Sequence, residues 1–440
     1  MPTQGTASGA TVTMPSLTPP TLPSRTKADI AYKVFYCLIA AWAFAKFLML
    51  FTLSRDIYES GFADYLYNYS GGFIRRGLSG EILFLVNDYL HIPPIIFCNT
   101  ISVLSFAILA YFIIRHFHRE GLGWYVLLGS FALGSISTYS IDFMRRDYIE
   151  LALMLAILTL HRKMRLAPWL IAGNAIAIFA LLLHEATFFF MIPALVLITN
   201  LKTENIVKAT AAWLPSIAVF MACCLFKGTP EQQQPIIDAI HHHFPGLLED
   251  GNIPWLLQFI GMDSATAFKL HIDYNITSIP HRLPIPAFAF TMFLICYIFY
   301  MAIAMPLAFA HKPLGITTGN RLARILIIQL TCLLPMFLLL SCDFSRICVY
   351  WVISSYIVYL SLSHEQIDTM FRPRYNRIID LISNRLFRIL PLNKLIITIM
   401  FLIIGIPIIK RAVHSIWEFS YLNKFIQSIL NIDNYISLLS

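Results

Sequence analysis

The feature that most restricts the fold of this chain is a series of apolar runs, each long enough to cross a lipid bilayer. A membrane-spanning helix needs roughly 20 residues, and the sequence holds about eleven such runs. Hydrophobic residues make up 58% of the 440 residues and charged residues 13%, against roughly 25% charged in soluble domains. A water-soluble fold could not bury this much apolar surface. We therefore predict an all-α, polytopic integral membrane bundle of about eleven transmembrane helices, within a range of about ten to thirteen.

The Lys and Arg residues between these spans indicate how the chain crosses the membrane. The side with more of them holds Arg119, Arg162 and the basic segment 363–393. Cytoplasmic loops carry the excess of Lys and Arg, so this side and the N-terminus are predicted to be cytoplasmic in a bacterial inner membrane. The predicted spans are residues 34–53, 93–114, 122–140, 148–161, 167–183, 186–200, 209–226, 286–309, 324–340, 347–362 and 394–409, with 79–90 as a further short or re-entrant helix.

Composition also separates the spans from tails and long connections. The first residues are rich in Thr, Pro and Ser, as is typical of a disordered segment. The net charge of +8 comes from basic residues that punctuate apolar runs, which favours membrane lipids over nucleic acid as partners. The predicted divisions are a disordered cytoplasmic tail (1–30), a transmembrane catalytic bundle (31–410), external segments with loop helices (54–92 and 227–285), a cytoplasmic segment on anionic headgroups (363–393) and a C-terminal amphipathic tail (411–440).

Charged residues next to the spans gather in four clusters on the predicted periplasmic face. An isolated charge is costly in an apolar bundle, so ionisable groups there normally face a partner or a water-filled cavity. Because the spans bring distant segments to one depth, we expect the four clusters to line a single cavity. They are Arg75-Arg76 among glycines, Arg145-Arg146-Asp147, His184-Glu185, and Asp343 with Arg346.

The predicted catalytic residues are Glu185, His184 and Asp343. The His184-Glu185 pair interrupts two long apolar stretches. One interpretation is a buried pair that lines a cavity, with one member as general base. The alternative is a helical hairpin whose tip touches water, with both side chains simply solvated. Asp343 and Arg346 are three residues apart and share a helix face, for which the alternative is an ordinary interhelical salt bridge.

Paired arginines are the second predicted part of the site. Two guanidiniums can hold a phosphate or pyrophosphate through parallel hydrogen bonds, and neighbouring glycines allow close backbone approach. The alternative is that these arginines extend to a membrane interface. The predicted substrate-binding residues are Arg75, Arg76, Arg145, Arg146, Arg346, Asp147, which would pair with one arginine, and Asp56 with Glu59, an acidic pair just after the first span.

The sequence does not favour a metal site. The consecutive residues His241, His242 and His243 point in different directions on a helix, so at most two could share one ion. We interpret them as part of a solvated amphipathic helix. No Cys/His spacing typical of zinc is present, and we expect neither a metal nor a cofactor.

Two segments carry a resemblance to known enzymes. They are Gly-Phe-Ile-Arg75-Arg76-Gly-Leu and Asp343-Phe-Ser-Arg346. With the arginine-rich external face and the embedded His/Glu pair, the chain resembles bacterial polytopic enzymes that act on undecaprenyl-pyrophosphate-linked sugars. These are the Wzy-type O-antigen and capsule polymerases, the related O-antigen ligases and the C-type glycosyltransferases, in which an acidic residue early in the first external loop is typical. The resemblance covers the topology of residues 34–409.

The resemblance implies a function and its partners. It implies a membrane glycosyltransferase or polymerase at the periplasmic face, for O-antigen or capsule and exopolysaccharide assembly. Arginines would hold the pyrophosphate of a lipid-linked oligosaccharide without a metal, and a chain-length regulator would be a further partner. The competing hypothesis is a transporter or flippase for an anionic lipid or solute. Charges collected at one face favour the enzyme, because transporters hold charges at several depths or break helices near the midplane.

Overall fold

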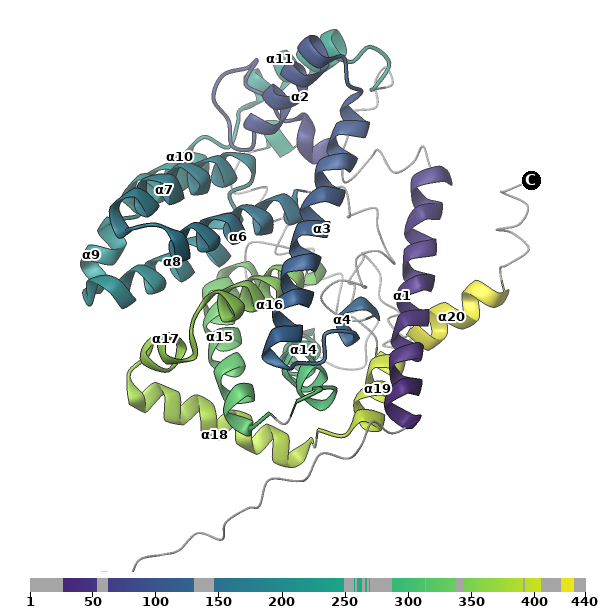
Figure 1. Cartoon of the computed structure of the whole chain (residues 1–440). Coiled ribbons are helices and arrows are strands. Elements are labelled where there is room, and N and C mark those ends of the chain that lie inside the picture. Colours follow the sequence, from purple (N-terminus) through teal and green to yellow (C-terminus); the bar gives the residue numbers. More distant parts are fainter. Residues whose placement is uncertain are drawn as a thin grey trace, which may run out of the picture.

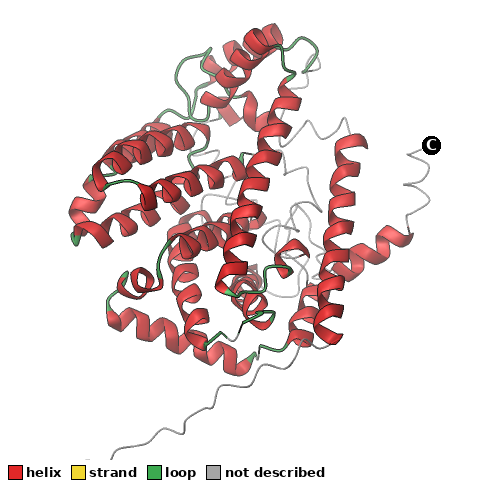
Figure 2. Cartoon of the chain, viewed as in Figure 1, coloured by secondary structure: helices red, strands yellow, loops and turns green. Residues whose placement is uncertain are grey.

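The structure is a computed structural model that describes most of the chain (Figure 1). The described residues are 27–53, 62–129, 146–248, 257, 259–262, 266, 269, 287–312, 314–337, 344–390, 392–404 and 421–430. They form helices and connecting loops and contain no β-strand, so the all-α prediction is confirmed for this part of the chain (Figure 2).

The helices follow one another along the chain, and two of the elements are short 3₁₀ turns. Their bounds are α1 Lys27–Leu53, η2 Ala63–Leu66, α2 Leu78–Leu90, α3 Pro94–Glu120, α4 Val126–Gly129, α6 Asp147–Lys163, α7 Leu166–Leu183, α8 Thr187–Thr203, α9 Ile206–Ala211, α10 Leu214–Leu225, α11 Pro230–His243, η4 Phe259–Gly261, α14 Ala287–Ala308, α15 Ile316–Pro335, α16 Phe344–Ser361, α17 His364–Thr369, α18 Pro373–Ile389, α19 Lys394–Ile404 and α20 Tyr421–Leu430.

Each predicted span overlaps at least one of these helices, but few are long and apolar enough to cross a membrane. Only α3 and α7 meet that condition among the described residues, and α18 with α19, bent by 90°, would add a third if they formed one span. The predicted span 209–226 is divided between α9 and α10, because Pro215 lies at the start of α10 and cannot continue a preceding helix. The eleven-span bundle therefore remains a prediction.

Local sequence sets several of these boundaries. Helix α3 starts with Pro94 at its first position and ends at Gly121, whose φ of +86° is left-handed, as proline and glycine favour at the two ends of a helix. Helix α17 starts with a capping box in which the Ser363 side chain and Gln366 exchange hydrogen bonds with each other's backbone. The last four residues of the predicted disordered tail, 27–30, already belong to α1.

The main apolar core lies where α6 meets its neighbours. Helix α6 packs against α3, α7 and α16, and α15 packs against α16, α8 and α18. In Figure 1, α6, α7, α8 and α10 lie side by side to the left of α3, and α6 contacts α3. Large fully buried side chains such as Trp169, Trp213 and Trp351 fill this core. Their indole nitrogens donate to Ile157 O, Thr199 Oγ1 and Leu326 O, which satisfies the buried polar atoms.

The two segments predicted to be external pack against each other at one end of the molecule (Figure 1). Their apolar side chains form a separate cluster that includes Phe62, Leu83 and Ile236. The buried Asn68 side chain links the segments by donating to Ile236 O at 3.2 Å. This small cap positions the loop before α2, which carries the first pair of predicted site arginines.

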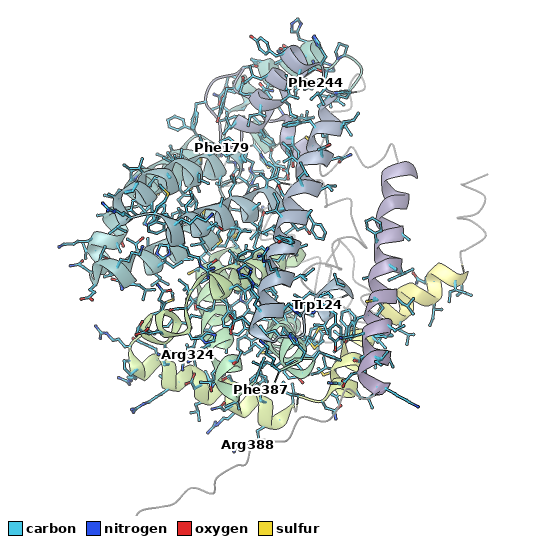
Figure 3. All side chains as sticks on the ribbon, viewed as in Figure 1. Trp124, Phe179, Phe244, Arg324, Phe387 and Arg388 are labelled. Carbon is cyan, nitrogen blue, oxygen red and sulfur yellow. The ribbon has the colours of Figure 1, made fainter. Side chains whose placement is uncertain are left out.

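At another end, ion pairs between a buried arginine and two partly exposed aspartates connect the predicted cytoplasmic segment to the core. Arg324 of α15, labelled in Figure 3, is 7% exposed. Its guanidinium binds Asp380 of α18 and Asp368 of α17, each at 2.7 Å. Helix α18 thus has one side tied to α15, while Ile378, Ile382 and several arginines remain exposed. The position of residues 363–393 on anionic headgroups remains a prediction.

The close approach at Gly80 gives a test of the packing. A methyl group added there would lie 2.3 Å from Tyr67 O and 2.8 Å from Asn68 Cβ, and backbone cannot move away cheaply. Gly80→Ala should therefore destabilise the protein by roughly 1–3 kcal/mol. Gly315→Ala is the control, because the nearest atom would be 3.5 Å away, and it should change stability by at most about 0.5 kcal/mol. Thermal unfolding in detergent measures both; equal melting temperatures would contradict the packing.

Candidate functional site

The His184-Glu185 pair occupies a tight turn between α7 and α8. His184 has extended backbone, which ends α7, and the N–H groups of Thr187 and Phe188 donate to the carbonyls of His184 and Glu185. The His184 residue is 4% exposed and the Glu185 side chain 14%. The tip of this hairpin is therefore buried by the rest of the protein, and the alternative of a simply solvated pair does not describe it.

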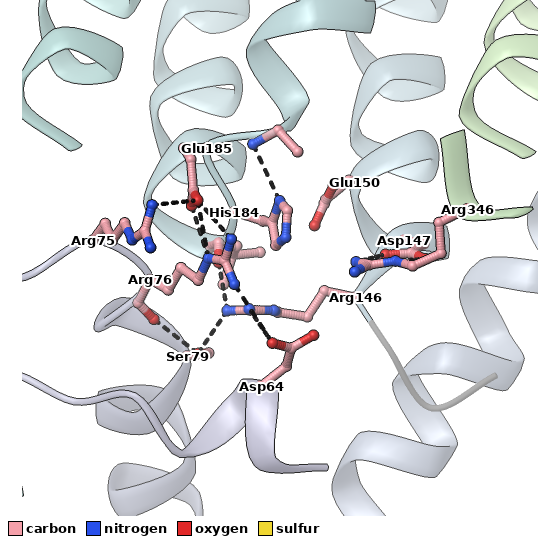
Figure 4. A network of polar contacts seen from close by, with 12 residues as sticks. Asp64, Arg75, Arg76, Ser79, Arg146, Asp147, Glu150, His184, Glu185 and Arg346 are labelled. Carbon is pink, nitrogen blue, oxygen red and sulfur yellow. Dashed lines mark hydrogen bonds and ion pairs between the residues drawn. The ribbon is translucent and has the colours of Figure 1, made fainter. Parts of the chain in front are cut away.

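Arg75 and Arg76 reach this turn from the loop before α2 (Figure 4). The Arg76 guanidinium donates to Glu185 through Nε at 2.8 Å and through Nη2 at 2.6 Å. Arg75 makes a single longer contact, with Nη1 3.3 Å from Glu185 Oε1. Arg76 has a φ of +67°, an uncommon conformation for a residue with a side chain. Surrounding contacts must hold this conformation, and the ion pair with Glu185 is the strongest of them.

Arg146, immediately before α6, lies behind this pair and has a fully buried side chain. Its Nη1 donates to Ser79 Oγ at 3.0 Å and to the carbonyl of Leu183. Both Arg146 and Arg76 also lie 3.6 Å from Asp64 Oδ1. Asp64 therefore bridges two arginines from distant parts of the chain. Asp64 was not among the predicted site residues, because this aspartate follows no arginine in the sequence and lies in a short 3₁₀ turn.

A second group of contacts continues from Asp147 to α16. Arg346 donates to Asp147 Oδ2 at 2.8 Å and Oδ1 at 2.5 Å, and the Tyr350 hydroxyl lies 2.6 Å from Asp147 Oδ1. Glu150, one turn along α6, is fully buried. Its Oε2 accepts from Thr187 Oγ1 at 3.0 Å and lies 3.1 Å from the Tyr350 hydroxyl. The spacing of Asp147 and Glu150 on one helix face could have indicated Glu150 from the sequence.

These contacts place four arginines and four carboxylates in one neighbourhood, and each of the arginines has a carboxylate within 4 Å. The predicted residues that lie together there are Arg75, Arg76, Arg146, Asp147, His184, Glu185 and Arg346. The other predicted residues, Arg145, Asp56, Glu59 and Asp343, lie outside the described residues. Their roles remain predictions.

Charge and burial oppose each other at Glu185. Burial alone would raise the pKa of this carboxyl, but the charges of Arg76 and Arg75 outweigh burial and hold the pKa well below its ordinary value. Burial, and then the charge of Arg76, lowers the pKa of His184 well below its ordinary value. The His184 Nδ1 atom accepts from the Ala186 N–H at 3.1 Å, so the neutral ring carries its hydrogen on Nε2. In this state neither residue offers a strong base.

The structure also shows where the consecutive histidines lie. His243, the last residue of α11, has its Nδ1 3.1 Å from Asp88 and its ring stacked on Phe84. Among the residues that the structure describes, no group of three or more His, Cys, Asp and Glu side chains is arranged to hold a metal ion.

Comparison with known proteins identifies no relative. No family model matches the chain, and neither a curated protein nor a solved structure is similar to it. Functional inference therefore depends on the residues and geometry of the chain itself.

The buried ion pair leads to a prediction for stability. Glu185→Gln keeps the shape of the side chain but leaves Arg76 and Arg75 without their shared counter-charge. Breaking a buried ion pair by removing one partner typically costs about 3–5 kcal/mol, so a loss of about 3 kcal/mol is expected in thermal or denaturant unfolding. Asp88→Asn, which removes the exposed pair with His243, is the control and should change the melting temperature little. A similar small effect for Glu185→Gln would mean that the buried pair does not form.

His184 and Glu185 should change the stability of the protein in different pH ranges. A folded pKa below the unfolded one adds stability that is complete above the unfolded pKa and is lost as pH falls. The loss due to His184 should therefore begin below its ordinary value of 6.5, and that due to Glu185 below 4.5. Melting temperatures between pH 8 and pH 3 measure both. Glu185→Gln should lose the more acidic component and keep the other, whereas identical profiles for the variant and the wild type would reject the assignment.

Proposed function

We propose that this chain is a bacterial inner-membrane glycosyltransferase or polysaccharide polymerase, with about eleven spans and its site at the periplasmic face. Its donor would be an undecaprenyl-pyrophosphate-linked oligosaccharide, used in O-antigen or capsule and exopolysaccharide assembly, with a chain-length regulator as a protein partner. The carrying observation is the convergence of Arg75, Arg76, Arg146 and Arg346 on one buried network. Fixed guanidiniums in a site shielded from water can stabilise the charge of a departing pyrophosphate.

The four arginines differ in how available their guanidinium groups are to the phosphates of a glycosyl donor. Arg76 and Arg346 each use two donor atoms on a carboxylate, and Arg146 is fully buried. Arg75 is 31% exposed and makes one contact with Glu185 at 3.3 Å. Arg75 is therefore the first contact for a phosphate group that enters the site, and Arg76 would follow if Glu185 moved away.

Such an exchange would also make Glu185 a base. A pyrophosphate carries more charge than a carboxylate and can bind both guanidiniums through several oxygens. Once the donor takes the arginines, burial is the larger remaining influence on Glu185, and burial raises its pKa. The freed carboxylate could then accept the proton of an acceptor hydroxyl, while that oxygen forms the new glycosidic bond and the pyrophosphate departs. The resting ion pair is thus compatible with general-base catalysis, because catalytic contacts often form only with substrate bound.

Two substitutions test this division of roles. Arg75→Lys keeps the charge but loses the planar donor pair, so the donor KM should rise about tenfold with kcat little changed. Glu185→Gln removes the base, so kcat should fall by about 10²–10⁴-fold. Glycan extension from a lipid-linked donor, assayed with purified folded protein, measures both effects.

Controls separate the proposed chemistry from folding and from transport. Asp88→Asn on α2 removes an exposed carboxylate whose ion-pair partner is His243 and should retain wild-type kcat. A folded Glu185→Gln protein with normal turnover would remove Glu185 from the mechanism. Movement of the lipid-linked donor across proteoliposomes without any glycan extension would instead identify the arginines as the binding site of a flippase.

A further inference from the structure

A second polar site lies at the far ends of the helices that form the first one. Helix α6 carries Asp147 at its start and Arg162 near its end, which are roughly 22 Å apart at about 1.5 Å per residue. Around Arg162 lies an open cavity of about 200 Å³. Its lining residues are His116, Arg119, Glu120, Arg162, Tyr359, Leu360, Leu362 and His364.

The cavity brings nitrogen donors together from three chain segments. Arg119 comes from the end of α3, Arg162 from the end of α6, and His364 from the start of α17. Arg162 is held in place because its Nε and Nη2 atoms donate to the carbonyls of Ser361 and Leu360, at 2.8 and 2.7 Å. The Glu120 carboxylate lies 3.4 Å from His364. The guanidiniums of Arg119 and Arg162 are the permanent positive charges at the cavity, and Glu120 is the carboxylate that lines it with them.

The need to satisfy carbonyls at helix C-termini can account for the basic residues of the cavity, but it does not account for Tyr359. The residue is 3% exposed and lines the cavity, yet its hydroxyl has no hydrogen-bond partner among the described residues. A buried hydroxyl without a partner costs free energy, so such groups normally face an acceptor. Basic side chains near helix C-termini often serve only to satisfy terminal carbonyls, as Arg162 does here. That role does not require a buried phenol beside them.

We propose that this cavity binds a phosphate-bearing ligand. A phosphate presents acceptor oxygens in several directions, which suits donors arranged around a cavity, and guanidiniums are the preferred partners of such groups. The Tyr359 hydroxyl would donate to one oxygen and Arg119 to others, while Arg162 contributes charge from its fixed position. A free phosphate ester and a lipid phosphate headgroup share this chemistry. The site is independent of the proposed glycosyl transfer, because none of its residues belongs to the arginine network around Glu185.

Phosphorus NMR of inorganic phosphate, titrated with the full-length protein in a phosphorus-free detergent, tests the site. Wild-type protein should bind phosphate saturably. Arg119→Gln and Tyr359→Phe should each weaken binding about tenfold, because each removes a hydrogen bond to a charged ligand. Arg115→Gln is the matched control: it lies one turn before Arg119, contacts Tyr111 and does not line the cavity, so binding should be unchanged.

A second experiment distinguishes a lipid phosphate from a soluble one, and an unfolding measurement separates effects on folding from effects on binding. Nanodiscs of phosphatidylcholine with and without phosphatidic acid offer the lipid phosphate, and a melting-temperature rise confined to the wild type and Arg115→Gln would identify a headgroup site. Saturation by inorganic phosphate without such a rise in phosphatidic acid nanodiscs would identify a soluble ligand. Without ligand, Tyr359→Phe should unfold no earlier than wild type, because it removes only an unpartnered hydroxyl. Binding of neither probe, or equal binding by Arg119→Gln and wild type, would overturn the proposal.

Discussion

The ion pair between Arg76 and Glu185 is the interaction on which the described site depends. An ionised carboxylate in the turn between two apolar helices would be costly without a partner, and Arg76 provides that partner through two short hydrogen bonds. The pair also connects the loop before α2 with the α7–α8 turn, which are more than a hundred residues apart in the sequence. Together with the contacts of Arg146 to Ser79 and Asp64, this pair joins the small cap to the helical core, and the positive charge of Arg76 lowers the pKa of Glu185.

The other arginines of the network also have carboxylate partners. Arg146 shares Asp64 with Arg76, and Arg346 and Tyr350 hold Asp147 beside Glu150. Buried charges in low dielectric need both counter-charges and hydrogen bonds. Each arginine in the network has a carboxylate within 4 Å, so the fold and the proposed function depend on the same residues. A substitution here should change stability together with any ligand binding, and only paired kinetic and unfolding measurements separate the two.

The sequence was sufficient for the helices and for part of the site, for identifiable reasons. Apolar length and Pro or Gly boundaries place helices such as α3 and α7 without knowledge of contacts, and charged residues between apolar runs single out His184-Glu185 and the arginine pairs. The pairing itself was not predictable: Asp64 precedes no recognisable motif, and the spacing that places Glu150 on the same helix face as Asp147 does not show that Tyr350 and Thr187 would bind it. The sequence also does not show that Arg76 forms an ion pair with Glu185. This pairing depends on the left-handed backbone conformation of Arg76, which only the folded loop defines.

A network in which each arginine already has a carboxylate within 4 Å restricts what it can bind. An anion cannot simply add to free arginines; it has to replace a carboxylate that is already hydrogen-bonded. A monoanion that displaced Glu185 would exchange one charge for another and leave a buried carboxylate unpaired, which is unfavourable. A pyrophosphate brings additional charge and more acceptor oxygens, so it can gain contacts with Arg75 that Glu185 makes only at 3.3 Å. The resting ion pair would thus favour multiply charged phosphate ligands over carboxylates, and selectivity would arise from the contact that the ligand must break.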